Sequence, residues 1–225
     1  MSVHSGRTAT ARRPPISSPN PKYERILEAA IQVFAEKGFY NARVNDIARQ
    51  AEVADGTIYL YFKNKDDLLI QLFENRMTEI IARFRGHLAV LPSATQKLRR
   101  FIELQLSLVA EHPTLAEVLT VELRQSGRFM REYKAKAFGE YLDIIEEIVV
   151  EGQRAGEFDP AADGKILKRA LFGALDEVSL AWLQGQQGGR PPFELPAAAD
   201  QIWRACAHGF LLGRTEQRES PEEDL

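Results

Sequence analysis

The stretch DGTIYLYFKNK, residues 55–65, places a glycine and a threonine ahead of three aromatic side chains and two lysines. On a helix that turns by about 100° per residue, Ile58 and Phe62 fall on one side. Tyr59 and Tyr61 fall on the flanks of the opposite side. The stretch is therefore predicted to form a short helix that docks one face on apolar neighbours and turns the other outward.

The outward face of this helix consists of Gly56, Thr57 and Leu60, and its chemistry suits a DNA major groove. Gly56 allows the backbone to approach closely, and Thr57 can hydrogen-bond to a base edge. Leu60 can contact a thymine methyl group. These three residues are candidate base contacts.

The side chains beside that face suit phosphate. The hydroxyls of Tyr59 and Tyr61 are candidate contacts to the DNA backbone. The ammonium groups of Lys63 and Lys65 are further candidates, and Lys65 is expected in the first turn of the next helix, where free backbone amides also favour an anion. The alternative interpretation is that the tyrosines pack on a neighbouring domain and the lysines are solvated.

Two helices are predicted before this stretch. From Lys22, KYERILEAAIQVFAEKG has apolar residues at helical spacing, and Gly38 ends it as a left-handed C-terminal residue would. VNDIARQA repeats the pattern in a short form, and little room remains before Asp55, a candidate cap for the third helix. Short helices joined by so tight a turn predict a helix-turn-helix.

The rest of the chain also has helical periodicity, and no run alternates as a strand would. Asn64 and Ser93 are capping signals for two further helices, and Pro113 marks another boundary. Long helices are expected from about Ser126, from Gly164 and from Ile202. The sequence therefore predicts an all-α fold of about nine helices.

Four regions are expected along the chain. They are a disordered basic arm (1–21), a helix-turn-helix DNA-binding domain (22–68), a ligand-binding and dimerisation domain (69–214) and an acidic tail (215–225). In the arm, Arg12 and Arg13 either add contacts to DNA or belong to a solubilising tail.

Composition excludes several classes of protein. No apolar run approaches the roughly 18 residues of a membrane-spanning helix, so no membrane partner is expected. Cys206 is the only cysteine, which excludes an internal disulfide and makes the cytoplasm the expected compartment. No metal-spaced cluster, G-x-S-x-G or phosphate-binding glycine loop is present, so neither a metal, a cofactor nor an enzymatic activity is expected.

The net charge of −3 hides an asymmetry. Up to Lys65 the chain has ten Lys and Arg against six Asp and Glu, whereas the remainder has 19 against 26. The first part is therefore the more plausible partner for a polyanion, although a few arginines in the arm account for much of the difference.

Residues 22–70 resemble the DNA-binding domain of the TetR family of bacterial repressors. The resemblance rests on A-x-x-x-F-x-x-x-G, on D-I-A and on G-T-x-Y-x-Y-F-x-x-K, in that order. It implies a homodimer whose third helices enter the major groove of a palindromic double-stranded operator. By position, it implies DNA contacts at Arg43, Ala54, Gly56, Thr57, Tyr59, Tyr61 and Lys65.

The chain departs from the family pattern at two places. Ala42 replaces a frequent threonine cap, so Asn41 is expected to cap the second helix instead. Ala54 and Asp55 stand where the family often has a serine and a basic residue. Asp55 is either a helix cap or a reader of a cytosine amino group.

The segments HPTLAEVLTVELRQS (112–126) and LFGALDEVSLAWL (171–183) are similar to a branch of TetR repressors that control fatty-acid degradation. That resemblance implies release from DNA when a long-chain acyl-CoA binds. The candidate ligand-binding residues are Phe101, Leu104, Leu108, Leu115, Leu119, Arg124, Arg128, Tyr141, Ile145, Phe172, Leu175 and Asp176.

Other interpretations stay open at this point. The apolar candidates are also what a core requires, and Asp176 needs a partner such as a ligand group, an arginine or the other subunit. A repressor of a multidrug efflux pump would also have an apolar pocket for small hydrophobic compounds, and a small helical hydrolase is the competing enzyme class. Small residues such as Ala170, Ala174 and Ala205 indicate that the last two helices pair with their copies.

Overall fold

The computed structural model of the chain describes residues 20–122 and 136–210, which form nine α-helices and one π-helical turn, without a strand. This confirms the expected all-α fold. The elements are α1 (Pro21–Asn41), α2 (Val44–Gln50), α3 (Asp55–Tyr61), α4 (Lys65–Ala89), α5 (Ala94–Glu111), α6 (Pro113–Glu117), the π-helical turn η1 (Val118–Glu122), α9 (Lys136–Arg154), α10 (Gly164–Gln187) and α11 (Leu195–Phe210).

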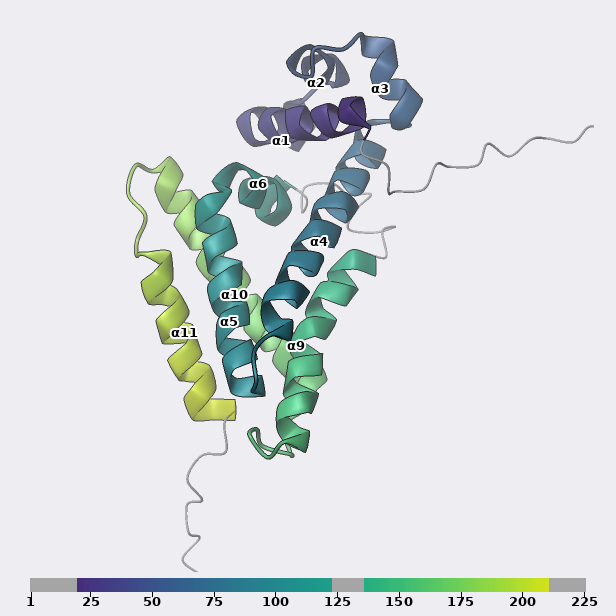
Figure 1. The fold of residues 1–225 in the computed structure, drawn as a ribbon. Coiled ribbons are helices and arrows are strands. Elements are labelled where there is room, and N and C mark those ends of the chain that lie inside the picture. Colours follow the sequence, from purple (N-terminus) through teal and green to yellow (C-terminus); the bar gives the residue numbers. More distant parts are fainter. Residues whose placement is uncertain (1–19, 123–135, 211–225) are drawn as a thin grey trace, which may run out of the picture.

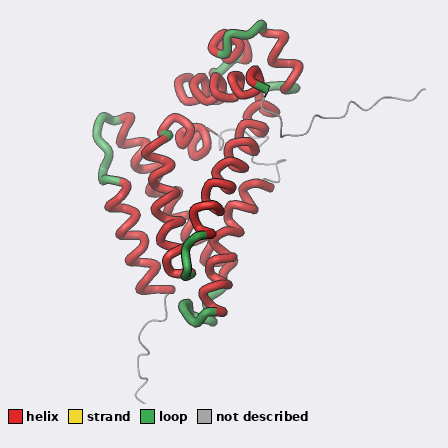
Figure 2. Tube along the Cα trace, viewed as in Figure 1, coloured by secondary structure: helices red, strands yellow, loops and turns green. Residues whose placement is uncertain are grey.

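Helices α1 to α3 gather at one end of the long α4, and the other helices run beside α4 towards its far end (Figure 1). Loops are short throughout the described ranges, and the two longest join α9 to α10 and α10 to α11 (Figure 2). The expected arm and acidic tail lie outside the described residues, except that Asn20 and Pro21 already belong to the start of α1.

Local capping explains where several helices begin. The Oδ1 atom of Asn20 accepts a hydrogen bond from the Lys22 amide at 3.0 Å, so α1 starts at Pro21. Asn64 caps α4 by accepting from the Asp67 amide at 2.9 Å, and Ser93 caps α5. The two capping signals after the third helix are therefore confirmed.

Two expected caps are wrong. The side chain of Asn41 donates back to the Lys37 carbonyl at 3.2 Å, and α2 instead begins after Arg43, whose amide donates to Asp46. Helix α3 has Ala54 at its N-cap and no side-chain cap, so Asp55 is its first residue and not its cap. An exposed carboxylate there still interacts favourably with the positive end of the helix.

The two parts of the fold meet along α1. Arg76 of α4 is only 8% exposed, and its guanidinium pairs with Glu24 and Glu28 of α1 as well as with Glu79. Helix α6 and η1 also pack against α1. The orientation of the helix-turn-helix therefore depends on contacts with α4 and with the α6–η1 segment.

The remaining helices continue the same apolar core away from the helix-turn-helix. Helix α9 packs between α4, α5 and α10, and α11 packs on α5. The rings of Phe84, Phe101 and Tyr141 lie in mutual contact at its centre, with centroids 5.4 to 6.0 Å apart. Offset and edge-to-face aromatic contacts of this kind stabilise a core beyond the area that they bury.

Close packing at the end of α9 requires a glycine. A Cβ atom at Gly152 would lie 2.4 Å from the ring of the buried Phe158. We therefore expect Gly152→Ala to lower the free energy of unfolding by about 1–3 kcal/mol through overpacking, measured by urea denaturation. Gly139→Ala on the same helix is the control, since nothing lies within 4 Å of its Cβ position; it should stabilise by roughly 0.5–1 kcal/mol. Equal effects of the two substitutions would contradict the packing argument.

Candidate DNA-binding surface and effector cavity

Helix α3 has the two faces predicted for it. Ile58 and Phe62 are each 1% exposed, whereas Tyr59 is 56% and Leu60 is 81% exposed. Gly56 is open as well, with no heavy atom within 4 Å of its Cβ position. Part of the predicted DNA-reading surface is therefore free to meet a partner.

Tyr61, predicted as a phosphate contact, is held by residues at the start of α1. Its hydroxyl accepts a hydrogen bond from the Asn20 side chain at 2.8 Å, and its ring lies edge-on to Tyr23. Tyr23 in turn stacks on Phe62, with centroids 5.3 Å apart. Tyr61 therefore anchors the end of α3 to the start of α1.

Lys65 is not placed as a phosphate contact. Its ammonium group donates to the backbone carbonyls of Phe39, Tyr40 and Ala42 at 2.5, 3.0 and 2.9 Å. These are the free carbonyls at the end of α1, where a cation is favoured. Lys65 also lies over the Phe39 ring, 4.6 Å from its centroid, and burial lowers the pKa of its ammonium group. All three of its N–H donors are therefore used within the fold.

The other predicted DNA contacts are accessible. Arg43, Ala54 and Lys63 are exposed, and Thr57 is half-buried beside them in sequence. Arg43 precedes α2 and Lys63 follows α3, so a positive charge stands at each end of the helix-turn-helix pair. This placement suits contacts to phosphates on either side of a groove.

A small apolar cavity lies where α4, α5, the α6–η1 segment, α9 and α10 meet. Its volume is about 80 Å³. We call it the effector cavity, after the ligand that the sequence predicts; it is lined by Phe73, Met77, Ile80, Gln105, Leu108, Val109, His112, Leu115, Ala116, Leu119, Thr120, Phe138, Tyr141, Phe172 and Asp176.

Half of the predicted ligand-binding residues line this cavity. They are Leu108, Leu115, Leu119, Tyr141, Phe172 and Asp176. The residues Phe101, Leu104, Ile145 and Leu175 are buried in the close-packed core and do not line it. Arg124 and Arg128 lie outside the described residues.

Sequence reasoning missed the contribution of α4. Phe73, Met77 and Ile80 lie on successive turns and form one wall of the cavity. Their i, i+4, i+7 spacing predicts a shared apolar face of the helix, but it does not predict that this face lines a cavity. The polar residues Gln105 and Thr120 were also missed.

Polar groups interrupt the apolar lining, and two of them are hydrogen-bonded to each other. The Tyr141 hydroxyl donates to Oε1 of Gln105 at 2.7 Å. Burial, with a smaller contribution from the charge of Asp176, raises the pKa of Tyr141 well above its usual range. The phenol is therefore neutral and acts as a fixed hydrogen-bond donor.

The segment that lines the cavity also contacts α1 of the helix-turn-helix part. Leu119 and Thr120 of η1 line the cavity, and Glu122 ends the same turn. Glu122 is only 6% exposed, and its carboxylate accepts a hydrogen bond from the Phe39 amide, next to the break in α1 at Gly38. Gly38 has φ of 73°, a backbone conformation that favours glycine.

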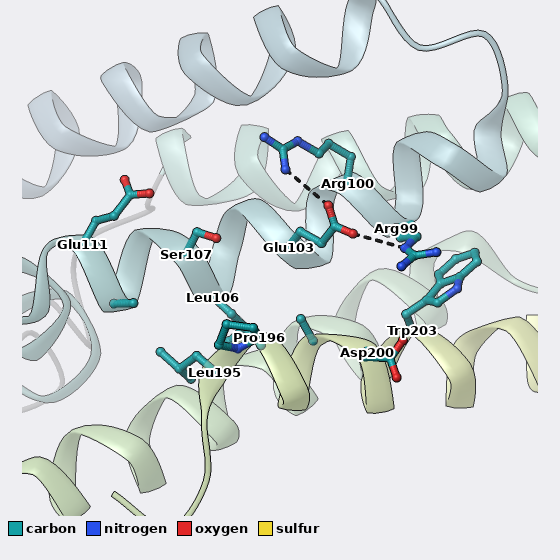
Figure 3. Close-up of a pocket in the computed structure, with 12 residues that line it drawn as sticks. Arg99, Arg100, Glu103, Leu106, Ser107, Glu111, Leu195, Pro196, Asp200 and Trp203 are labelled. Atoms are coloured by element: carbon teal, nitrogen blue, oxygen red, sulfur yellow. Dashed lines mark hydrogen bonds and ion pairs between the residues drawn. The ribbon is translucent and has the colours of Figure 1, made fainter.

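A larger hollow between α5 and α11 has a different character. It has a volume of about 370 Å³, and in Figure 3 Glu103 lies between Arg99 and Arg100. The carboxylate pairs with both guanidinium groups, at 3.1 and 3.2 Å. These arginines already have a partner within the fold, so the groove is a weaker candidate for a phosphate-bearing ligand than its two cations suggest.

Two protein-family models match the chain. "Bacterial regulatory proteins, tetR family" matches residues 26–72, and "YsiA-like protein, C-terminal region" matches residues 73–209. The chain belongs to the TetR family of bacterial regulatory proteins. The resemblance of residues 22–70 is thereby confirmed.

The similarity to known proteins extends beyond the helix-turn-helix. The chain is 40% identical over 190 residues to the fatty acid metabolism regulator protein of Bacillus subtilis, covering 84% of this chain and 96% of the relative. Among solved structures, FadR of Bacillus subtilis in complex with stearoyl-CoA has a TM-score of 0.77 at 36% identity, covering 83% of this chain and 98% of that one. The fatty acid degradation regulator FadR of Bacillus halodurans has a TM-score of 0.79 at 34% identity, covering 85% and 97%.

Two further features are absent from the described ranges. No helix there combines the length and apolarity needed to cross a lipid bilayer. Within the same residues no group of three or more His, Cys, Asp or Glu side chains is arranged to hold a metal ion.

Substituting the two lysines beside α3 separates a structural role from a phosphate contact. Lys65→Met leaves three carbonyls without their donor, so we expect the free energy of unfolding to fall by about 1–3 kcal/mol. The salt dependence of operator binding should not change. Lys63→Met should keep full stability but reduce the slope of log K against log salt by about 0.9. The measurements are urea unfolding and a salt titration of DNA binding; a reduced slope for Lys65→Met would contradict the structural role.

Proposed function

We propose that this protein is a homodimeric repressor of fatty-acid degradation genes that leaves its palindromic operator when a long-chain acyl-CoA binds. The observation that carries the proposal is the position of the effector cavity. The short α6–η1 segment lines that cavity and also holds the backbone of α1 through Glu122. The stearoyl-CoA bound by a similar FadR supports the choice of effector.

DNA recognition is assigned to the exposed side of α3 and its flanks. Gly56, Thr57, Tyr59 and Leu60 face the major groove, and Arg43 and Lys63 contact phosphates. Ala54, at the N-cap of α3, lies at the same surface. Tyr61 and Lys65 support this surface from within.

A dimer is needed to place two such helices on one operator. The outer side of α10 has exposed small or apolar residues on successive turns, among them Ile166, Ala170 and Ala174. On α11, Ala205 is exposed as well. We propose that these faces pair with their copies, because small residues let helices approach closely.

Binding of an acyl chain has to enlarge the cavity. Ligand pockets are usually about 300 Å³ or more, whereas this cavity is about 80 Å³. Its walls include α4 and the α6–η1 segment, so an entering chain displaces elements that contact α1. Moving α1 changes the separation of the two recognition helices from the roughly 34 Å that successive DNA turns require.

We propose that Arg124 and Arg128, which follow η1 in the sequence, contact the phosphates of CoA. The efflux-pump alternative is less well supported, because the similar proteins named above are regulators of fatty-acid metabolism and degradation. We also propose that the protein is not an enzyme and acts in the cytoplasm. In support, burial raises the pKa of Cys206 to about 11, which makes it a poor nucleophile.

The proposal is tested by DNA binding at fixed salt. The purified protein is expected to bind DNA from upstream of its own gene, and saturating stearoyl-CoA should lower that affinity by at least about fivefold. Free CoA should have no effect. The double variant Thr57→Ala, Tyr59→Ala should lose specific binding yet keep a dimeric mass by light scattering. Binding that is indifferent to stearoyl-CoA would refute the effector, and operator binding by the double variant would refute the assigned surface.

Coupling through Glu122 has a separate test. Glu122→Ala removes the acceptor of the Phe39 amide, so stearoyl-CoA should still bind while its effect on operator affinity falls. The control is Glu117→Ala on the same segment, because that side chain hydrogen-bonds to Gln187 instead of α1. Operator affinity is measured with and without ligand for each protein. An unchanged response in Glu122→Ala would exclude this route.

A further inference from the structure

The lining of the effector cavity is unsuited to a free carboxylate. Ten of its side chains are apolar, and the polar ones are Gln105, His112, Thr120, Tyr141 and Asp176. Neither lysine nor arginine lines it among the described residues. An anion entering this cavity would meet neither a lysine nor an arginine among its described lining residues, at a substantial desolvation cost.

One hydrogen-bond donor in this cavity lacks a partner. Oε1 of Gln105 accepts the Tyr141 proton, which fixes the orientation of the amide. Its nitrogen forms no hydrogen bond within the described part of the chain. Tyr141 is itself 2% exposed and surrounded by the rings of Phe84, Phe101 and Phe172, so the pair cannot easily turn elsewhere.

A neutral acceptor satisfies such an amide best. A carbonyl oxygen accepts an N–H bond without bringing a charge, and a donor left unpaired against an apolar ligand costs free energy. An acyl-CoA carries one carbonyl oxygen next to its apolar chain, in the thioester. An acyl chain lying among the apolar walls can therefore place this oxygen near Gln105.

We propose that Gln105 determines effector specificity by donating a hydrogen bond to the thioester carbonyl oxygen of the acyl-CoA. Tyr141 is the positioning residue that holds the amide. The inference rests on the proposed function, because it assumes that an acyl-CoA enters this cavity. It adds a selection for the acyl linkage to the selection for chain length that the apolar walls supply.

The test compares two ligands that differ only in the carbonyl group. Stearoyl-CoA has the thioester, whereas S-octadecyl-CoA is the thioether of the same length. The dissociation constant of each is measured by calorimetry with the full-length protein. The native protein should bind the thioester roughly tenfold more tightly, as expected for one hydrogen bond whose donor is otherwise unpaired.

Variants assign that preference to Gln105. Gln105→Leu has a similar shape and no donor, so it should bind the two ligands with equal affinity. Leu108→Met is the control, because it changes another lining residue without adding or removing a donor, and it should keep the tenfold ratio. Circular dichroism checks that each variant is folded, and the comparison on the native protein needs no variant.

The outcomes separate this inference from the proposed function. If stearoyl-CoA binds and releases the operator but the native protein does not prefer the thioester, the role of Gln105 is wrong and the repressor stands. If Gln105→Leu still prefers the thioester, the role of Gln105 is also wrong and the repressor stands. If neither ligand binds the native protein, the acyl-CoA effector is wrong and the role of Gln105 falls with it.

Discussion

The backbone of Phe39 is the constraint on which the two parts of this fold depend. The break in α1 at Gly38 leaves amide and carbonyl groups without helical partners, and buried groups of this kind must be satisfied. Glu122 accepts from the Phe39 amide, while Lys65 donates to its carbonyl. Both bonds involve a charged group and are therefore stronger than ordinary backbone bonds. The helix-turn-helix is thus oriented by one side chain from η1 and one from the start of α4.

A long acyl chain carries enough binding energy to alter such an arrangement. Burial of apolar surface is worth about 0.8 kcal/mol per methylene group, so ten buried methylenes supply roughly 8 kcal/mol. Shifting a two-state equilibrium from 1:99 to 99:1 requires a differential affinity of about 5.5 kcal/mol. Part of the chain's energy can therefore be used to widen the small cavity and displace η1. A short acyl group would not supply this amount, which gives a physical reason for a long-chain effector.

Much of the fold could be predicted because its signals are local. The caps Asn64 and Ser93 act within three residues, and the i, i+4 pair Ile58 and Phe62 determines which face of α3 is buried. The contacts of Phe39 could not be predicted, since Glu122 lies 83 residues away and nothing in its own segment points to α1. Periodicity also assigns a residue to a face without giving its depth. Leu108 reaches the cavity, whereas Phe101 and Leu104 on the same helix end in the core.

Family patterns have a similar limit, because they give a position and not the atoms that a side chain contacts. Lys65 occupies the place of the lysine in the TetR motif, yet its ammonium group is bound by three carbonyls of α1. Gln105 belongs to none of the quoted motifs, yet it presents an N–H donor in an apolar cavity. For an ionic or polar residue, the decisive evidence is which of its donors are already used. By that criterion Lys65 maintains the geometry of the DNA-binding surface, and Gln105 is the residue with a hydrogen bond left to offer a ligand.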